Sequence, residues 1–174
     1  DFINENSPLT YFDYSYGIST VYASVVFKDN LYVATNQGVF YSKWNLPFRE
    51  ESFSLLEGTT GQAWNIQVIA GQLFCANNNG ALIIEGNHNV KTLDTKGYFC
   101  FKKIPSHPNY ILGANYNGFA VFEKMANGWK FRNQIIGFEK PSISFEIDKS
   151  YLWLKKDGLI YQMTININFI HTYF

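Results

Sequence analysis

The stretch CANNNGALII, residues 75–84, places three asparagines and a glycine between two short apolar runs. Similar stretches are ATNQGVFY (34–41), GANYNGFAVF (113–122) and LKKDGLIY (154–161). Asn and Gly tolerate the positive φ angles that a two-residue hairpin turn requires. The flanking runs are rich in β-branched and aromatic residues, which are typical of strands. Each stretch therefore predicts two antiparallel strands joined by a tight turn.

These stretches recur at a nearly constant interval along the chain. Aligned on Gly38, Gly80, Gly118 and Gly158, they are 42, 38 and 40 residues apart. A period near forty residues indicates a repeat protein. Other columns of the alignment agree, at four residues upstream (Ala34, Ala76, Ala114, Leu154) and at six (Tyr32, Phe74, Leu112, Leu152). A further column stands sixteen residues upstream, at Tyr22, Trp64 and Ser142, and an insertion moves it to Phe99 in the third repeat.

Each repeat holds four strand-like runs, an apolar one before the hairpin and a more polar one after it. Four antiparallel strands in about forty residues are typical of a β-propeller blade. We therefore predict an all-β protein, a β-propeller of four four-stranded blades in either a partial ring or a small complete one. The blades are expected at 21–57, 63–96, 97–136 and 141–174, and residues 1–20 as a leading outer strand. A plain antiparallel sandwich is the alternative fold.

The chain of 174 residues is long enough for one packed domain. It begins at Asp1 and not at Met, which favours a processed product or a piece of a longer protein. A partial ring would expose two apolar blade faces, so we also expect self-association.

Composition excludes several classes of partner. The 14 basic and 14 acidic residues balance, so nucleic acid is not expected as a partner. No apolar run approaches the roughly 20 residues of a membrane helix, so this segment is not expected to contact a membrane. Cys75 and Cys100 are interpreted as free thiols, with a disulfide as the less favoured alternative.

No catalytic or metal-binding motif is present. The three histidines are scattered, and each is interpreted as a surface residue without a ligand partner (His88, His107, His171). We therefore predict that the protein is not an enzyme and that it needs neither a metal nor another cofactor. A polysaccharide-acting enzyme is a weak alternative, for which Lys96, Glu139 and Lys140 are the nearest polar groups.

One rim of the propeller is the predicted binding surface. The loops that lead into each blade should lie beside the hairpin turns, and both are rich in amide and aromatic side chains. Such a surface suits an oligosaccharide or another neutral polar ligand, because rings stack and amides supply directional hydrogen bonds. Trp64 is expected to belong first to the blade core and only second to the rim. The candidate ligand-binding residues are Asn36, Trp64, Asn78, Tyr98, Tyr116, Lys140 and Lys156.

Two of the units resemble the repeat of the bacterial two-component regulator propellers. In DNLYVATNQGVF (29–40) the matching residues are Asp29, Leu31, Tyr32, Val33, Ala34, Thr35, Gly38 and Val39. In YLWLKKDGLIY (151–161) they are Leu152, Trp153, Leu154, Gly158 and Leu159. The two middle units match loosely, since Cys75 and Gly113 replace the usual branched residue. The resemblance covers residues 21–164.

The resemblance implies a function and a location. It is strongest to the sensor halves of membrane-anchored regulators from polysaccharide-degrading bacteria, which lie outside the inner membrane and in some members sense oligosaccharides. It implies a periplasmic or extracytoplasmic binding module whose partners are the other domains of a larger regulator. The motif marks blade structure and transfers no ligand residues. A propeller scaffold for protein–protein contact or self-assembly is the second expected function.

Overall fold

The computed structural model describes residues 14–47, 49 and 52–165 of the chain. A 3-10 helix, η1 (Tyr14–Tyr16), comes first and is followed by strands only. The first sheet contains β1 (Val21–Phe27), β2 (Asn30–Thr35), β3 (Val39–Lys43) and β4 (Ser54–Leu55). The second contains β5 (Ala63–Ile69), β6 (Gln72–Asn77), β7 (Gly80–Ile84) and β8 (Val90–Asp94). The third contains β9 (Tyr98–Ile104), β10 (His107–Asn115), β11 (Gly118–Met125) and β12 (Gly128–Gln134), and the fourth contains β13 (Phe145–Asp148), β14 (Tyr151–Lys156) and β15 (Leu159–Thr164).

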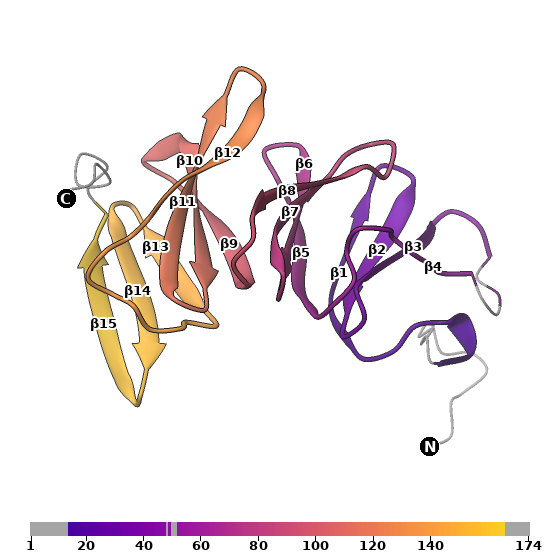
Figure 1. Ribbon diagram of the computed structural model, residues 1–174, viewed down its shortest axis with the longest axis horizontal. Coiled ribbons are helices and arrows are strands. Elements are labelled where there is room, and N and C mark those ends of the chain that lie inside the picture. Colours follow the sequence, from indigo (N-terminus) through magenta and orange to yellow (C-terminus); the bar gives the residue numbers. More distant parts are fainter. Residues whose placement is uncertain (1–13, 48, 50–51, 166–174) are drawn as a thin grey trace.

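Within every sheet the strands follow chain order and all neighbours are antiparallel. The four sheets stand side by side in chain order, with the first and last at opposite ends of the molecule (Figure 1). Their first strands β1, β5, β9 and β13 contact one another in succession. This arrangement confirms the propeller prediction and contradicts the two-layer sandwich. Two forms were predicted, a partial ring and a small complete one, and the described residues form the partial ring.

Apolar side chains fill the space between each pair of consecutive sheets. Tyr32 and Leu73 belong to the cluster between the first two sheets, Phe74 and Phe122 to the next, and Leu112 and Leu152 to the last. Every residue of β7 is buried, because this strand has a neighbouring sheet on each face. A strand enclosed on both faces needs no polar alternation, which explains its continuous apolar sequence.

The hairpin glycines occupy two different positions. Of the four aligned glycines, only Gly158 is a central residue of a two-residue turn, together with Asp157, and their φ angles are 77° and 51°. Gly80 and Gly118 follow their turns and pair within the ladder instead. The predicted Asn-Gly turns are therefore wrong for the second and third sheets. Backbone crowding explains glycine there, since a Cβ at Gly80 would stand 2.6 Å from the carbonyl oxygen of Asp94.

A buried polar residue holds the turn in each of the first three sheets. Asn77 Oδ1 accepts a hydrogen bond from the Asn79 N–H at 2.8 Å, and Asn115 accepts one from Asn117 at 2.9 Å. Thr35 has the same role in the first sheet. Asx and Ser/Thr turns of this kind need no positive φ angle. The fourth sheet has Lys156 at this position, a side chain without an acceptor atom.

The altered turn shifts the fourth repeat by one residue against the glycine alignment. Leu159, and not Gly158, stands where Gly80 and Gly118 stand in their sheets. A one-residue shift moves every side chain of a strand to the other face. Leu152 and Leu154 consequently pack against the third sheet, and Tyr151 and Trp153 project to the opposite side. The glycine-based columns are therefore wrong for this repeat.

Two further expectations concern the chain ends. Residues 14–20 contain η1 and no strand, so this part of the predicted leading strand is wrong. The rest of that predicted strand, residues 1–13, lies outside the described residues. The fourth strand of the last blade was expected in residues 166–174, which also lie outside them.

Both cysteines are free thiols, as interpreted from the sequence. Burial raises the pKa of the Cys75 thiol to about 12. The pKa of Cys100 rises to about 11, chiefly through burial, with Lys102 opposing the effect. Neither thiol therefore ionises near neutral pH.

We expect Gly118→Ala to lower the free energy of unfolding by roughly 3 kcal/mol, because a Cβ there meets the Phe138 carbonyl at a φ of 107°. The matched control is Gly158→Asn, where nothing lies within 4 Å and φ is 77°. This change should cost less than about 1 kcal/mol. Urea unfolding followed by circular dichroism measures the free energy of unfolding of both variants. Equal losses of stability would contradict the different roles assigned to these two glycines.

In the folded protein at pH 8, a disulfide reagent such as DTNB should label Cys100 slowly and Cys75 only on unfolding. In guanidinium chloride both should react fast. In the unfolded chain the Cys75 thiol has its ordinary pKa of 9.0, whereas in the folded chain its pKa is about 12. Stability should therefore fall as the pH rises through this interval. Fast labelling of two thiols in the folded chain would disprove the assignment.

Candidate binding rim

Hydrogen bonds place the hairpin turns beside the loops that enter each sheet. The Gly61 N–H donates to the carbonyl oxygen of Gln37 at 3.1 Å, and the Asn78 N–H donates to that of Gln62 at 2.8 Å. The Tyr116 N–H donates to the Gly97 carbonyl at 3.1 Å. These bonds join turns and entry loops into one continuous rim, at the edge of the protein where it was predicted.

Three first strands carry a β-bulge at this rim. The ladder register shifts between Val21 and Ala23, between Ala63 and Asn65, and between Tyr98 and Cys100. The residues left outside the ladder are Tyr22, Trp64 and Phe99. A bulge removes one residue from the alternation of a strand and re-aims its side chain. Each of these three sheets therefore presents one aromatic ring at the rim while the residues on either side of it keep their places in the strand.

The three rings form a continuous row, here called the aromatic row. The ring centroids of Tyr22 and Trp64 are 5.2 Å apart, and those of Trp64 and Phe99 are 5.7 Å apart. Tyr116, from the turn of the third sheet, extends the row at 4.7 Å from Phe99. Tyr22 is 40% exposed and Tyr116 is 39% exposed. The row thus offers several ring faces to solvent within one short path.

Polar groups fix and border the aromatic row. The Trp64 indole N–H donates to the Tyr116 hydroxyl at 3.1 Å, and the Gln62 amide donates to the Tyr22 hydroxyl at 2.7 Å. Asn78, from the neighbouring turn, has a buried Oδ1 that lacks a hydrogen-bond partner in the described structure. Rigid rings bordered by amides and hydroxyls can stack on the apolar face of a ligand and hydrogen-bond its edge.

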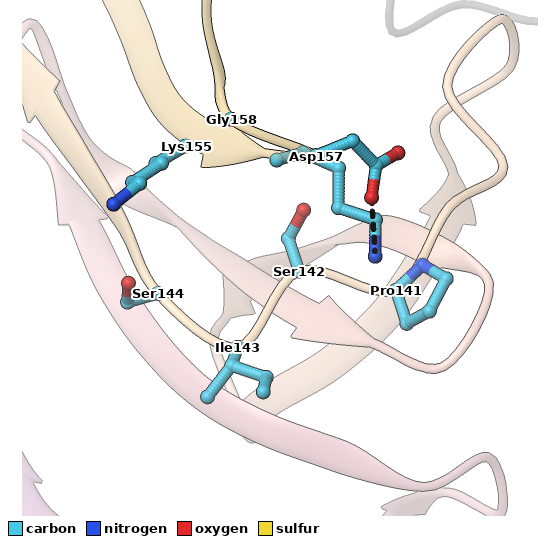
Figure 2. Close-up of a pocket in the computed structure, with 8 residues that line it drawn as sticks. Pro141, Ser142, Ile143, Ser144, Lys155, Asp157 and Gly158 are labelled. Carbon is cyan, nitrogen blue, oxygen red and sulfur yellow. Dashed lines mark ion pairs between the residues drawn. The ribbon is translucent and has the colours of Figure 1, made fainter.

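The row leads to a pocket of about 340 Å³ at the entry to the fourth sheet. Ile143 occupies the position equivalent to the bulged residues, is 74% exposed and lines this pocket. Its carbonyl oxygen accepts a hydrogen bond from the Cys100 thiol, beside Phe99. Figure 2 shows the pocket between the segment at Pro141–Ser144 and the turn at Asp157–Gly158.

The predicted site residues separate into two groups along the rim. Trp64, Tyr116 and Asn78 come together around the aromatic row, although sequence placed Trp64 first in the core. Lys140 and Lys156 lie at the far pocket, where both pair with Asp157, at 4.0 and 3.6 Å. Asn36 is exposed on the turn of the first sheet, and its N–H donates to the Thr20 carbonyl.

Tyr98 is the incorrect member of the predicted set. Its side chain is fully buried between the second and third sheets, where its ring stacks on Phe101 at 5.4 Å. Burial, together with the hydroxyl's bond to Asp94 at 2.6 Å, raises the tyrosine pKa well above its usual value. The bulge explains the error, because it directs the next residue, Phe99, to the rim.

Tyr22, Phe99 and Gln62 were not among the predicted ligand-binding residues, although the loop that contains Gln62 was placed at the rim. The signal for the first two was the column sixteen residues before the repeat glycines, which contains Tyr22, Trp64 and, after the insertion, Phe99. In the fourth repeat that column pointed to Ser142, one residue short of Ile143, because of the shifted turn.

Groups for other chemistry are sparse in the described part of the chain. Its residues contain no cluster of three or more His, Cys, Asp or Glu side chains able to hold a metal ion. Glu139 and Lys96, named above for a hydrolytic alternative, are exposed loop residues. Among the same residues, no helix is long and apolar enough to cross a membrane.

No protein-family model and no curated protein sequence matches the chain. Solved structures with a similar fold include the extracellular domain assigned to the hybrid two component system BT3049 from B. thetaiotaomicron. The TM-score is 0.68 at 13% identity, over 90% of this chain and 22% of that chain. The extracellular domain assigned to the one component system BT4673 from the same organism gives 0.59 at 15% identity, over 83% and 21%.

The computationally designed protein Ika4 is also similar, with a TM-score of 0.61 at 11% identity over 85% of this chain and 92% of that chain. This chain spans about a fifth of either B. thetaiotaomicron chain but nearly the length of the designed one. At these identities the likeness establishes the fold. The expected similarity to regulator sensor propellers is therefore confirmed as a similarity of fold.

Proposed function

We propose that this protein is a non-catalytic binding module that senses an oligosaccharide for a regulator outside the cytoplasm. The observation that carries the proposal is the aromatic row of Tyr22, Trp64 and Phe99, extended by Tyr116. Sugar rings have an apolar face of C–H groups and an edge of hydroxyls. Stacked rings bordered by amides match both parts of such a ligand.

The preformed state of the row supports binding. Its two hydrogen bonds to side-chain hydroxyls and its ring contacts hold the rings in place before a ligand arrives. A rigid site loses little conformational entropy on binding, so more of the contact free energy remains as affinity. Sensing requires such a site but no bond cleavage, which agrees with the sparse acid–base groups at the rim.

The structural neighbours support the location and the partners. Two of them are extracellular domains of regulators. We infer that this chain serves the same kind of protein and that other domains of a larger regulator are its partners.

We expect Trp64→Ala to weaken oligosaccharide binding by about 10-fold or more, because the central ring of the row is lost. Isothermal titration with cellotetraose, xylotetraose, mannotetraose and galactotetraose measures the affinities. The matched control is Trp44→Ala, which removes a tryptophan that is 54% exposed at the opposite edge, near Asp29. This control should leave the affinity unchanged. Equal effects of the two variants would contradict the proposed site.

A second candidate function is assembly, favoured by the outward face of the last sheet. Tyr151, Trp153 and Ile160 are 42%, 39% and 77% exposed there. The equivalent side chains of the third sheet, such as Leu112 and Phe119, are fully buried by the fourth. This face therefore has the character of a blade interface without its neighbour.

The opposite end of the molecule suggests what covers this face. On the first sheet, Ile18 and Phe53 already pack over Val33 and Phe40. Head-to-tail stacking of two copies would collide with that cover. A second copy that applies its own last sheet, in a two-fold symmetric dimer, covers both exposed faces at once.

We expect the protein to dimerise and the double variant Trp153→Ser, Ile160→Lys to raise the dimer dissociation constant by at least about 10-fold. Light scattering over a concentration series measures this constant. The matched control is Trp44→Ser, Leu46→Lys, which alters two exposed residues of similar type in the loop that follows β3. A native chain that stays monomeric at every concentration would rule out this function.

A further inference from the structure

The pocket at the end of the aromatic row has a different chemistry from the row itself. Its lining combines Pro141, Ser142, Ile143 and Ser144 from the entry segment with Lys155, Lys156, Asp157 and Gly158 from the hairpin. The described lining residues include no aromatic one. Two lysines and two serines therefore belong to the lining of a pocket that also includes Ile143.

The charges around this pocket do not cancel. Asp157 is the single carboxylate among the described lining residues, and both Lys156 and Lys140 approach it, at 3.6 and 4.0 Å. Lys155 forms no ion pair with any described carboxylate. Lys140, Lys155 and Lys156 are thus opposed by Asp157 and by Glu139, the neighbour of Lys140 in the chain, which leaves one more positive than negative charge among these described residues in a protein whose total charge is zero.

An unsatisfied donor belongs to a residue of the same lining. Ser142 is only 2% exposed, and its Oγ has no hydrogen-bond partner among the described residues. A buried hydroxyl without a partner costs about 1–3 kcal/mol, so native structures almost always satisfy it. Figure 2 shows this hydroxyl directed to the side of the hairpin turn, between Lys155 and the ion pair at Asp157.

We propose that this pocket binds the anionic substituent of an acidic oligosaccharide, a carboxylate or a sulfate, whose sugar rings lie on the aromatic row. The inference rests on the proposed function and adds the ligand's charge. An anionic oxygen accepts the Ser142 hydrogen bond, and the ammonium groups of Lys155 and Lys156 balance its charge. Charge-assisted bonds of this kind are stronger than neutral ones.

The size of the pocket sets a limit on the ligand. A volume of about 340 Å³ lies at the lower end of the roughly 300–1,000 Å³ usual for ligand sites. The pocket therefore takes one terminal acidic residue or its substituent, and the other rings of the ligand follow the row from Phe99 towards Tyr22.

The test compares an acidic oligosaccharide with its uncharged methyl ester. Titration calorimetry with trigalacturonate and with its fully methyl-esterified form should show the acid binding about 10-fold more tightly. Added salt should reduce only the affinity for the acid, because salt screens charge. A 6-O-sulfated galactotriose distinguishes the sulfate source from the carboxylate source. Equal affinities for acid and ester, with no binding of the sulfated sugar above that of galactotriose, would overturn the proposal.

Matched variants locate the effect. In Lys155→Gln, Lys156→Gln the preference for acid over ester should disappear, and Ser142→Ala, which preserves both charges, should reduce it by about threefold. The control Lys124→Gln, Lys130→Gln removes the same charge from the third sheet and should keep the preference. Thermal melting establishes that each variant is folded. A preference retained by both pocket variants would overturn the assignment.

The same data separate this inference from the proposed function. If the ester binds as tightly as the acid and Trp64→Ala weakens both, the row binds sugar and only the anionic subsite is disproved. If none of the saccharides binds to the native chain, both proposals are wrong.

Discussion

The central strands of each sheet are apolar on both faces, and this constraint determines the rest of the structure. Such a sheet is stable only with another sheet on either side. In the second sheet the condition is fully met, since every residue of β7 is buried. Consecutive copies must therefore stand side by side, with their first strands adjacent. Residues at equivalent positions of these first strands, whose sheets stand side by side (Figure 1), therefore form a row along one edge of the molecule.

The β-bulges turn this recurrence into a surface. In an unbroken strand, a ring at the rim would have to replace a core residue or point into a neighbouring sheet. One extra residue per strand avoids that conflict, so Tyr98 stays in the core while Phe99 reaches the rim. Because the insertion occurs in three adjacent strands, Tyr22, Trp64 and Phe99 meet at stacking distance. The candidate site is thus a product of the repeat and not of one specialised loop.

The fourth copy departs from the other three through one residue at the end of its second strand. Thr35, Asn77 and Asn115 anchor their turns with a side-chain acceptor, and Lys156 has none. The chain there uses Asp157 and Gly158 at positive φ instead, and the strand that follows is displaced by one residue. The pocket lies at this altered turn, and the one-residue displacement decides that Trp153 stands on the outward face. The departure therefore concerns the proposed anionic subsite, whereas the aromatic row comes from the repeat itself.

Sequence by itself determined the repeat, its strands and the propeller class, because apolar periodicity and turn residues are local properties that recur every forty residues. It also placed Trp64, Asn78 and Tyr116 on one rim. Only the tertiary structure decided which face each strand of the fourth copy buries and which neighbour, Tyr98 or Phe99, reaches solvent. Both choices depend on strand register, and a shift of a single residue reverses them. Register depends on the geometry of each hairpin turn, as at Asp157 and Gly158, and on the neighbouring sheet that each strand face packs against, and the repeat pattern alone encodes neither.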